Sequence, residues 1–212
     1  ITGLGAVSGF GLGVEPLWQG LCAGHSAVRL RPDLPFFKNG GPPPPPVSLV
    51  PLPEDGETDP LVTGMPRAST MVTLAAREAL ADAGLLPLLD ASAPGHAAVA
   101  VNQASIRIGV CIGTTHGEKN PWLAAQRDGS AQAGALRTSM HGPAYPAMRL
   151  AAACGAVQLR VVSTACASGN SALAVALEWI RRDVVDVVLC GGCDALSDFV
   201  LRGFQSLRAL SP

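Results

Sequence analysis

Cys166 is the residue whose type and surroundings best fit covalent chemistry. It lies in the run STACASG at residues 163–169, after an apolar stretch that predicts a strand and before one that predicts a long helix. At such a strand–turn–helix junction the sulfur stands above the sheet edge, and helix amides directed at it favour the thiolate. Small residues at 167–169 leave room for a bulky substrate, and the Cys166 amide could donate to an oxyanion. The pattern predicts a nucleophile; geometry alone leaves a structural cysteine as the alternative.

The other five cysteines fit chemistry less well. An even total of six would allow disulfides, but no export signal is visible and the chain is long enough to fold without them. Cys22, Cys111 and Cys154 lie in apolar stretches, where cysteine packs as a small hydrophobe. Cys190 and Cys193 have the CxxC spacing of a redox or metal site, but they follow a strand and no second pair completes four ligands. We therefore expect no metal or cofactor.

The elements that must position Cys166 are typical of a mainly parallel α/β sheet, because small and β-branched apolar runs alternate with amphipathic stretches. Ser69 or Thr70 is expected to cap the second helix, and Gly84 to end it. Strands are predicted at 1–7, 107–113, 159–163 and 184–189, and helices at 14–23, 69–84, 144–154 and 168–182.

Composition restricts the class of protein. The chain has 212 residues, 48% of them hydrophobic and 15% charged, with a net charge of −1. That length suits one large domain or half of a bigger one, and the scattered basic residues argue against nucleic acid as a partner. No secretory signal is visible and no apolar run reaches the roughly 18–20 residues of a membrane span, so we expect a soluble, cytoplasmic protein that does not bind membranes. Because the sequence opens in a predicted strand and stops at Pro212, after a run typical of ordered structure, we expect a segment of a longer polypeptide.

Two stretches interrupt the α/β pattern. The first, at about residues 32–66, contains the unbroken proline run Pro42–Pro46. Since proline lacks an amide donor and disfavours helix before it, this stretch is expected to be an extended surface excursion. A stiff loop is the favoured interpretation, and recruitment of an aromatic-grooved module is the alternative. The second stretch, at 118–141, is polar and predicts no definite element.

Several separated motifs together resemble the β-ketoacyl-acyl-carrier-protein synthases, the elongating condensing enzymes of fatty-acid and type II polyketide synthesis. The run around Cys166 is similar to the family's active-site signature. The other similar segments are ITGLGAVS at 1–8, RIGVCIGT at 107–114, GGCDA at 191–195 and GFQSLRALS at 203–211. Their order along the chain also matches the family, and the resemblance excludes the proline-rich excursion.

The resemblance implies a thiolase-like fold, in which two similar βαβαβ-type halves stack into α-β-α-β-α layers and the protein is normally dimeric. Residues 1–212 would form the first half, the N-terminal β-ketoacyl synthase domain, with the C-terminal half absent. The family draws two histidines and a lysine from its second half to handle malonyl. None of the four histidines here lies in a matching motif, so we expect residues 1–212 alone not to catalyse condensation.

The resemblance also implies a reaction and its partners. Cys166 would take an acyl group from the phosphopantetheine of an acyl carrier protein, and decarboxylated malonyl would then attack that thioester to give a 3-ketoacyl product. Chain-length factors lack the cysteine, so its presence favours the active subunit, acting as a homodimer or as a heterodimer with a chain-length-factor-like subunit. The alternatives are a non-catalytic partner subunit of such a synthase, in which Cys166 is a relic, and a thiolase-type acyltransferase.

Two further residues are assigned to the acyl pocket through the same resemblance. His116, in the loop after the central strand, matches a residue that is usually apolar in elongating synthases and gates the acyl pocket, and Phe204 matches an aromatic residue beside the same site. A histidine gate disfavours a long saturated chain unless the imidazole is hydrogen-bonded. We therefore infer an acyl group that is shorter, more polar or conjugated. The alternative is a loop histidine turned to solvent.

Replacing His116 with isoleucine is expected to shift the accepted acyl groups toward longer saturated chains, because the change removes a polar group from the pocket entrance. Competition among acyl thioesters of graded length measures the shift. An unchanged length profile would count against a gate at this position.

Overall fold

The computed structural model describes residues 1–31, 45–52, 62, 65–89, 100–101, 104–117 and 142–210. Most of the predicted excursion at 32–66 and all of the polar stretch at 118–141 lie outside these residues.

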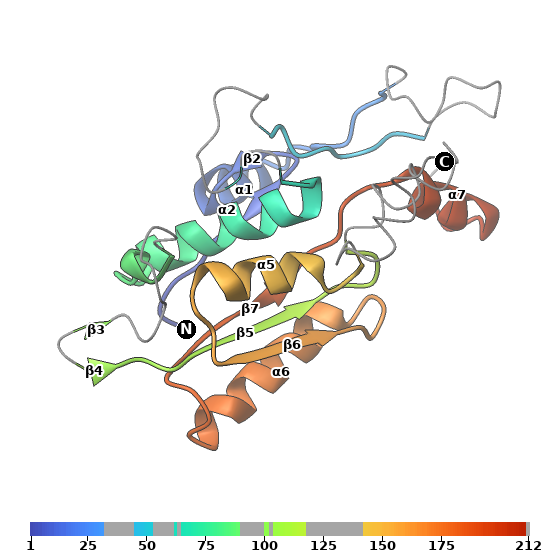
Figure 1. Cartoon of the computed structure of the whole chain (residues 1–212). Helices are drawn as coiled ribbons and strands as arrows, with labels where there is room; N and C mark the ends of the chain where they lie inside the picture. The colour runs from blue at the N-terminus through green and yellow to red at the C-terminus, as the bar shows by residue number, and fades with distance from the viewer. Residues whose placement is uncertain are drawn as a thin grey trace.

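A three-stranded parallel sheet forms the centre of the fold (Figure 1). Its strands are β5 (Ile108–Gly113), β6 (Gln158–Val162) and β7 (Val187–Gly192), in the order β6-β5-β7. Every residue of β5 is buried, as expected for a continuous apolar run between two parallel neighbours. The predicted parallel α/β architecture is confirmed.

Helices cover both faces of this sheet. Helix α5 (Tyr145–Ala153) packs on one face against β5 and β6, and α2 (Arg67–Asp82) packs on the outer side of α5. Helix α6 (Ser168–Arg181) packs on the opposite face (Figure 1). The main core lies between α2, α5 and the sheet and includes Leu80, Leu88, Val110, Leu150 and Leu189.

The remaining elements are short and lie around this core. They are β1 (Val7–Ser8), β2 (Gly11–Leu12), α1 (Val14–Cys22), η2 (Leu86–Leu89), β3 (Ala100–Val101), β4 (Ala104–Ser105) and α7 (Asp198–Ser206). Strand β1 pairs with β2, and β3 with β4, both in antiparallel hairpins. Within the described part of the chain, no helix has the length and apolar character that crossing a membrane requires.

Two predicted strands differ from the observed ones. The last strand was expected at 184–189 but occupies Val187–Gly192, because Gly191 and Gly192 pair in register with Ile112 and Gly113 of β5. The strand before Cys166 was predicted at 159–163 but occupies Gln158–Val162, and it is an edge strand whose first three residues are exposed. The carboxyl ends of all three strands consequently meet at Gly113 and its neighbours.

The prediction of a strand at 1–7 was wrong for residues 1–6, which join no strand among the described residues. This segment runs along α2, where the amide of Leu4 donates to Asp82 and that of Ala6 to Glu78, each at 2.9 Å. Gly5 lies so close to the helix that a Cβ there would be 1.8 Å from the carbonyl oxygen of Ala75. The segment is therefore held by helix carboxylates and close backbone contact rather than by a sheet.

The predicted cap of the second helix was also wrong. Pro66, in an extended conformation, is the N-cap of α2, so Ser69 and Thr70 lie inside the helix and are buried. Thr70 donates its hydroxyl to the carbonyl oxygen of Pro66 at 3.2 Å. Gly84 does follow the helix end, with a φ of +69° that glycine adopts without strain.

The end of β5 approaches the start of α6 very closely. A Cβ added to Gly113 would lie 2.1 Å from the carbonyl oxygen of Ser168, closer than any side chain allows. Since this contact is between two backbones, no rotamer change can relieve it. Gly113 therefore fixes the distance between the central strand and the helix that follows Cys166.

Gly113→Ala is expected to lower the free energy of unfolding by about 2–3 kcal/mol, because the added methyl group must push α6 away from the sheet. Gly203→Ala makes the same change inside α7, where a Cβ meets nothing within 4 Å, and should stabilise by about 0.5–1 kcal/mol. Urea denaturation of both variants measures the difference. Equal stabilities would contradict the close approach of β5 and α6.

Candidate active site

Cys166 stands in the turn between β6 and α6. The strand ends at Val162, the helix begins at Ser168, and Cys166 is exposed. Ala165, immediately before it, has a φ of +51°, a left-handed conformation that is uncommon for a residue with a Cβ. Strain of this kind concentrates at functional sites, and α/β-hydrolases expose their nucleophile on a strained strand-to-helix turn.

Ser168 stabilises this turn through two side-chain hydrogen bonds. Its side chain is buried, and its Oγ accepts a hydrogen bond from the Thr164 amide at 3.0 Å and donates one to the Ala165 carbonyl at 2.6 Å. The Thr164 and Ser171 hydroxyls form a further bond of 2.8 Å. Thr164, Ser168 and Ser171 thus stabilise the strained turn from within.

Two helix amides that were expected to favour the Cys166 thiolate instead donate hydrogen bonds within the turn. The amide of Ala167 donates to the Thr164 carbonyl and that of Ser168 to the Ala165 carbonyl, each at 3.1 Å. The assignment of the Cys166 amide to an oxyanion hole stays a prediction.

The remaining cysteines have different surroundings. Burial raises the pKa of Cys111 and of Cys154 to about 11, and it also raises the pKa of Cys190, so these groups stay thiols near neutral pH. The Cys193 sulfur lies 3.5 Å from the Ala68 carbonyl oxygen. Across the described ranges, no three His, Cys, Asp or Glu side chains gather as a metal site requires. Cys22 is exposed, but it lies at the end of α1 and not in a strained turn.

Asp194 brings the loop after β5 beside this turn. Its Oδ1 accepts hydrogen bonds from the Thr114 hydroxyl and the His116 amide, both at 2.7 Å, and from the Thr115 and Gly117 amides, both at 3.1 Å. Burial on its own would raise the pKa of Asp194, but these four residues outweigh that effect and hold the pKa below its usual range. The carboxylate is therefore ionised near neutral pH.

The His116 side chain lies against Asp194 rather than in solvent. It is 20% exposed, with Nδ1 3.9 Å from Asp194 Oδ1, and its ring meets Phe199 edge-on with centroids 6.1 Å apart. Phe204 lies further along α7 and is 42% exposed. The structure thus brings His116 to Phe199, whereas the pocket roles of His116 and Phe204 stay predictions.

Comparison with known proteins assigns the family. Residues 1–212 match the family description "Beta-ketoacyl synthase, N-terminal domain". The chain belongs to the β-ketoacyl synthase family. It is 30% identical to Nodulation protein E of Rhizobium meliloti (strain 1021), with 100% of this chain and 50% of that protein covered. It therefore spans about half the length of that relative.

Solved structures agree with this assignment. A β-ketoacyl synthase from Burkholderia phymatum STM815 matches with a TM-score of 0.75 and 26% identity over 100% of this chain and 50% of that one. The ishigamide ketosynthase/chain length factor matches with a TM-score of 0.73 and 26% identity over 100% of this chain and 51% of that one. The predicted thiolase-like fold and family resemblance are confirmed.

Three residues of the site in this synthase-family chain were not predicted from the sequence. Ser168 was noted only as small, Asp194 only as part of a motif, and Phe199 not at all. Asp194 could have been found, because it follows one strand of a parallel pair and the Thr114–Gly117 loop follows the other, so both lie at the same sheet edge. Phe199 gives no comparable signal, since its contact depends on where α7 packs.

Ser168→Ala is expected to cost about 1–3 kcal/mol of stability, because it leaves the Thr164 amide without its buried acceptor. It should also slow alkylation of Cys166. Ser206→Ala is the matched control: the Ser206 hydroxyl likewise donates to a carbonyl three residues earlier, at 2.7 Å, but is exposed. Thermal unfolding and alkylation kinetics test both variants, and an equal loss in the two would contradict the support assigned to Ser168.

Proposed function

We propose that Cys166 is the acyl-accepting nucleophile of a condensing enzyme. The observation that carries the proposal is its exposure in a strained strand-to-helix turn, preceded by Ala165 at a φ of +51°. Family membership supports the reaction class, which is acyl transfer followed by carbon–carbon bond formation. Ala167 and Gly169, which follow Cys166 closely in the sequence, are small, which suits approach by a long carrier arm.

The first step transfers an acyl group from a carrier-protein thioester. The Cys166 thiolate attacks the thioester carbonyl, the oxyanion collapses, and the bond to the phosphopantetheine sulfur breaks. The departing thiolate takes up the proton that the Cys166 thiol released. The product is an acyl-Cys166 thioester and a free carrier thiol.

The second step forms the new carbon–carbon bond. A malonyl-carrier thioester loses carbon dioxide, and the electron pair of the broken bond remains on the α-carbon. That carbon attacks the acyl-Cys166 carbonyl, and the Cys166 sulfur leaves as a thiolate, which takes up a proton from solvent. The product is a 3-ketoacyl-carrier thioester. We place the groups that bind and activate malonyl in a second half of the protein, as expected if the complete synthase is as long as its relatives.

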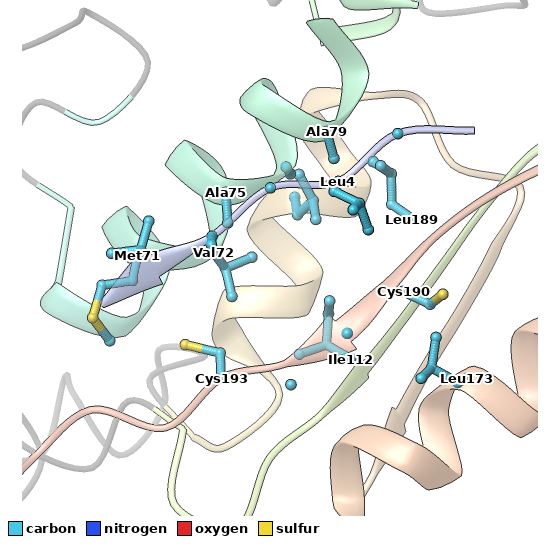
Figure 2. A pocket seen from close by; sticks show the side chains of 18 of the residues that line it. Leu4, Met71, Val72, Ala75, Ala79, Ile112, Leu173, Leu189, Cys190 and Cys193 are labelled. Atoms are coloured by element: carbon cyan, nitrogen blue, oxygen red, sulfur yellow. The ribbon is translucent and has the colours of Figure 1, made fainter. Parts of the chain in front are cut away.

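A cavity beside β7 could accommodate part of that second half. It measures about 600 Å³ and lies between the N-terminal segment and α2 on one side and β7 on the other (Figure 2). Along its other edge β7 pairs with β5, and among the described strands β7 has no further neighbour. The lining is mostly apolar, with Leu4, Val72 and Leu189 among its side chains. An extended segment from the second half would fill the gap and hydrogen-bond to β7.

A second synthase-like subunit is the proposed partner at the opposite sheet edge. Strand β6 pairs only with β5 among the described strands, and Leu159 within it is 40% exposed. On α6, Leu177 and Ile180 are 50% and 44% exposed. Exposed apolar surface on this scale indicates an interface. The ishigamide structure, described as a ketosynthase with a chain length factor, supports a chain-length-factor-like partner for this surface.

Treatment of the complete protein with a cysteine-directed epoxide inhibitor such as cerulenin is expected to label Cys166 and to abolish formation of 3-ketoacyl product. Peptide mass spectrometry locates the label, and Cys22→Ala, which removes the other exposed thiol at a catalytically uninvolved position, controls for adventitious alkylation. A protein that labels nowhere and forms no product would instead be a non-catalytic partner subunit.

A further inference from the structure

The Asp194 carboxylate collects donors from four consecutive residues of one loop. The Thr114 hydroxyl and the amides of Thr115, His116 and Gly117 all reach Oδ1, and the Thr115 amide also lies 3.1 Å from Oδ2. The Thr114 hydroxyl in turn accepts the Gly117 amide at 2.8 Å. A single carboxylate thus accepts hydrogen bonds from every residue of the turn 114–117.

This loop also contacts the turn that carries Cys166. The Thr115 hydroxyl donates to the Ala165 carbonyl at 3.3 Å, and the Thr114 amide donates to the Val162 carbonyl at 2.9 Å. Ala165 is the strained residue next to Cys166, and its carbonyl also accepts the Ser168 amide and hydroxyl. The loop is therefore bonded to Asp194 on one side and to the strained turn on the other.

The position of Asp194 is itself fixed by the sheet. The amide of Cys193 donates to the Gly113 carbonyl at 3.0 Å, so the chain leaves β7 in register with the end of β5. Asp194 follows directly and faces the loop that leaves β5. The register of the sheet therefore fixes the position of the Asp194 carboxylate. The carboxylate fixes the loop, and the loop contacts Ala165, the residue before Cys166.

We infer that Asp194 is a positioning residue for acyl transfer to Cys166, acting through the Thr114–Gly117 loop and the Thr115–Ala165 hydrogen bond. The inference rests on the proposed function. Asp194 does not touch the acyl group in this account. It holds the loop so that the strained turn presents the sulfur at the angle from which it attacks the thioester carbonyl, where a displacement of about 1 Å can cost roughly 100-fold in rate.

The test measures single-turnover acylation of Cys166 in the complete protein, with a hexanoyl N-acetylcysteamine thioester as the acyl donor. For Asp194→Ala we expect the saturating rate constant to fall at least tenfold, with the half-saturating donor concentration changed by less than about threefold. The acylated fraction at the end should match the wild type, because misplacement slows a site whereas unfolding removes it. Asp194→Asn keeps one acceptor oxygen and should recover to within about fivefold of the wild-type rate.

Two further variants separate positioning from general destabilisation. Thr115→Val removes the hydroxyl that reaches Ala165 and keeps the loop amide on Asp194, and it should slow acylation at least threefold. Asp186→Ala is the matched control, since its carboxylate is 41% exposed against 40% for Asp194 and accepts the Arg107 amide at 2.7 Å at the other end of β7. It should leave the rate constant within about twofold of the wild type.

The outcomes distinguish this inference from the proposed function. If the wild type is acylated at Cys166 and both Asp194→Ala and Thr115→Val react within twofold of it, the inference is wrong and the proposed function stands. If Asp194→Ala does not fold, Thr115→Val decides between the same two outcomes. If the wild type takes up no acyl group, the proposed function is wrong and the inference is rejected with it.

Discussion

The parallel register of β6, β5 and β7 is the constraint on which the site depends. Pairing of Gly113 with both Val162 and Gly192 brings three strand ends to one edge of the sheet. One strand end leads into the turn of Cys166, one into the Thr114–Gly117 loop, and one into Asp194. Residues about 80 positions apart in sequence, such as Thr114 and Asp194, become hydrogen-bonded partners for this reason.

Glycine makes this convergence possible. The absence of a side chain at Gly113 lets the end of β5 lie against the backbone of Ser168. The hydroxyl of the same serine accepts a hydrogen bond from the Thr164 amide and donates one to the Ala165 carbonyl. These two bonds hold Ala165 in its left-handed conformation. The close packing of β5 against α6 and the strained conformation of Ala165 thus depend on the same serine. Together they leave the sulfur of Cys166 exposed.

How much of this arrangement the sequence predicts depends on whether a feature is local. Strand–helix alternation and the motif around Cys166 predict the parallel sheet and the exposed turn, because both arise from runs of a few residues. The N-terminal segment was misassigned because its alternating pattern resembles a strand, while its actual partners are the carboxylates of Glu78 and Asp82, more than 70 residues away. The strand limits of β7 and the contact of Phe199 with His116 were missed for the same reason, since register and helix packing are set between distant segments.

Tandem mass spectrometry of the complete protein after incubation with an acyl-carrier thioester detects acyl transfer to Cys166 itself. We expect a single hydroxylamine-sensitive acyl adduct, on the peptide that contains residues 163–169 and on the sulfur of Cys166. An acyl mass on another cysteine, or no adduct on a folded protein whose carrier thioester is intact, would contradict acyl transfer to Cys166.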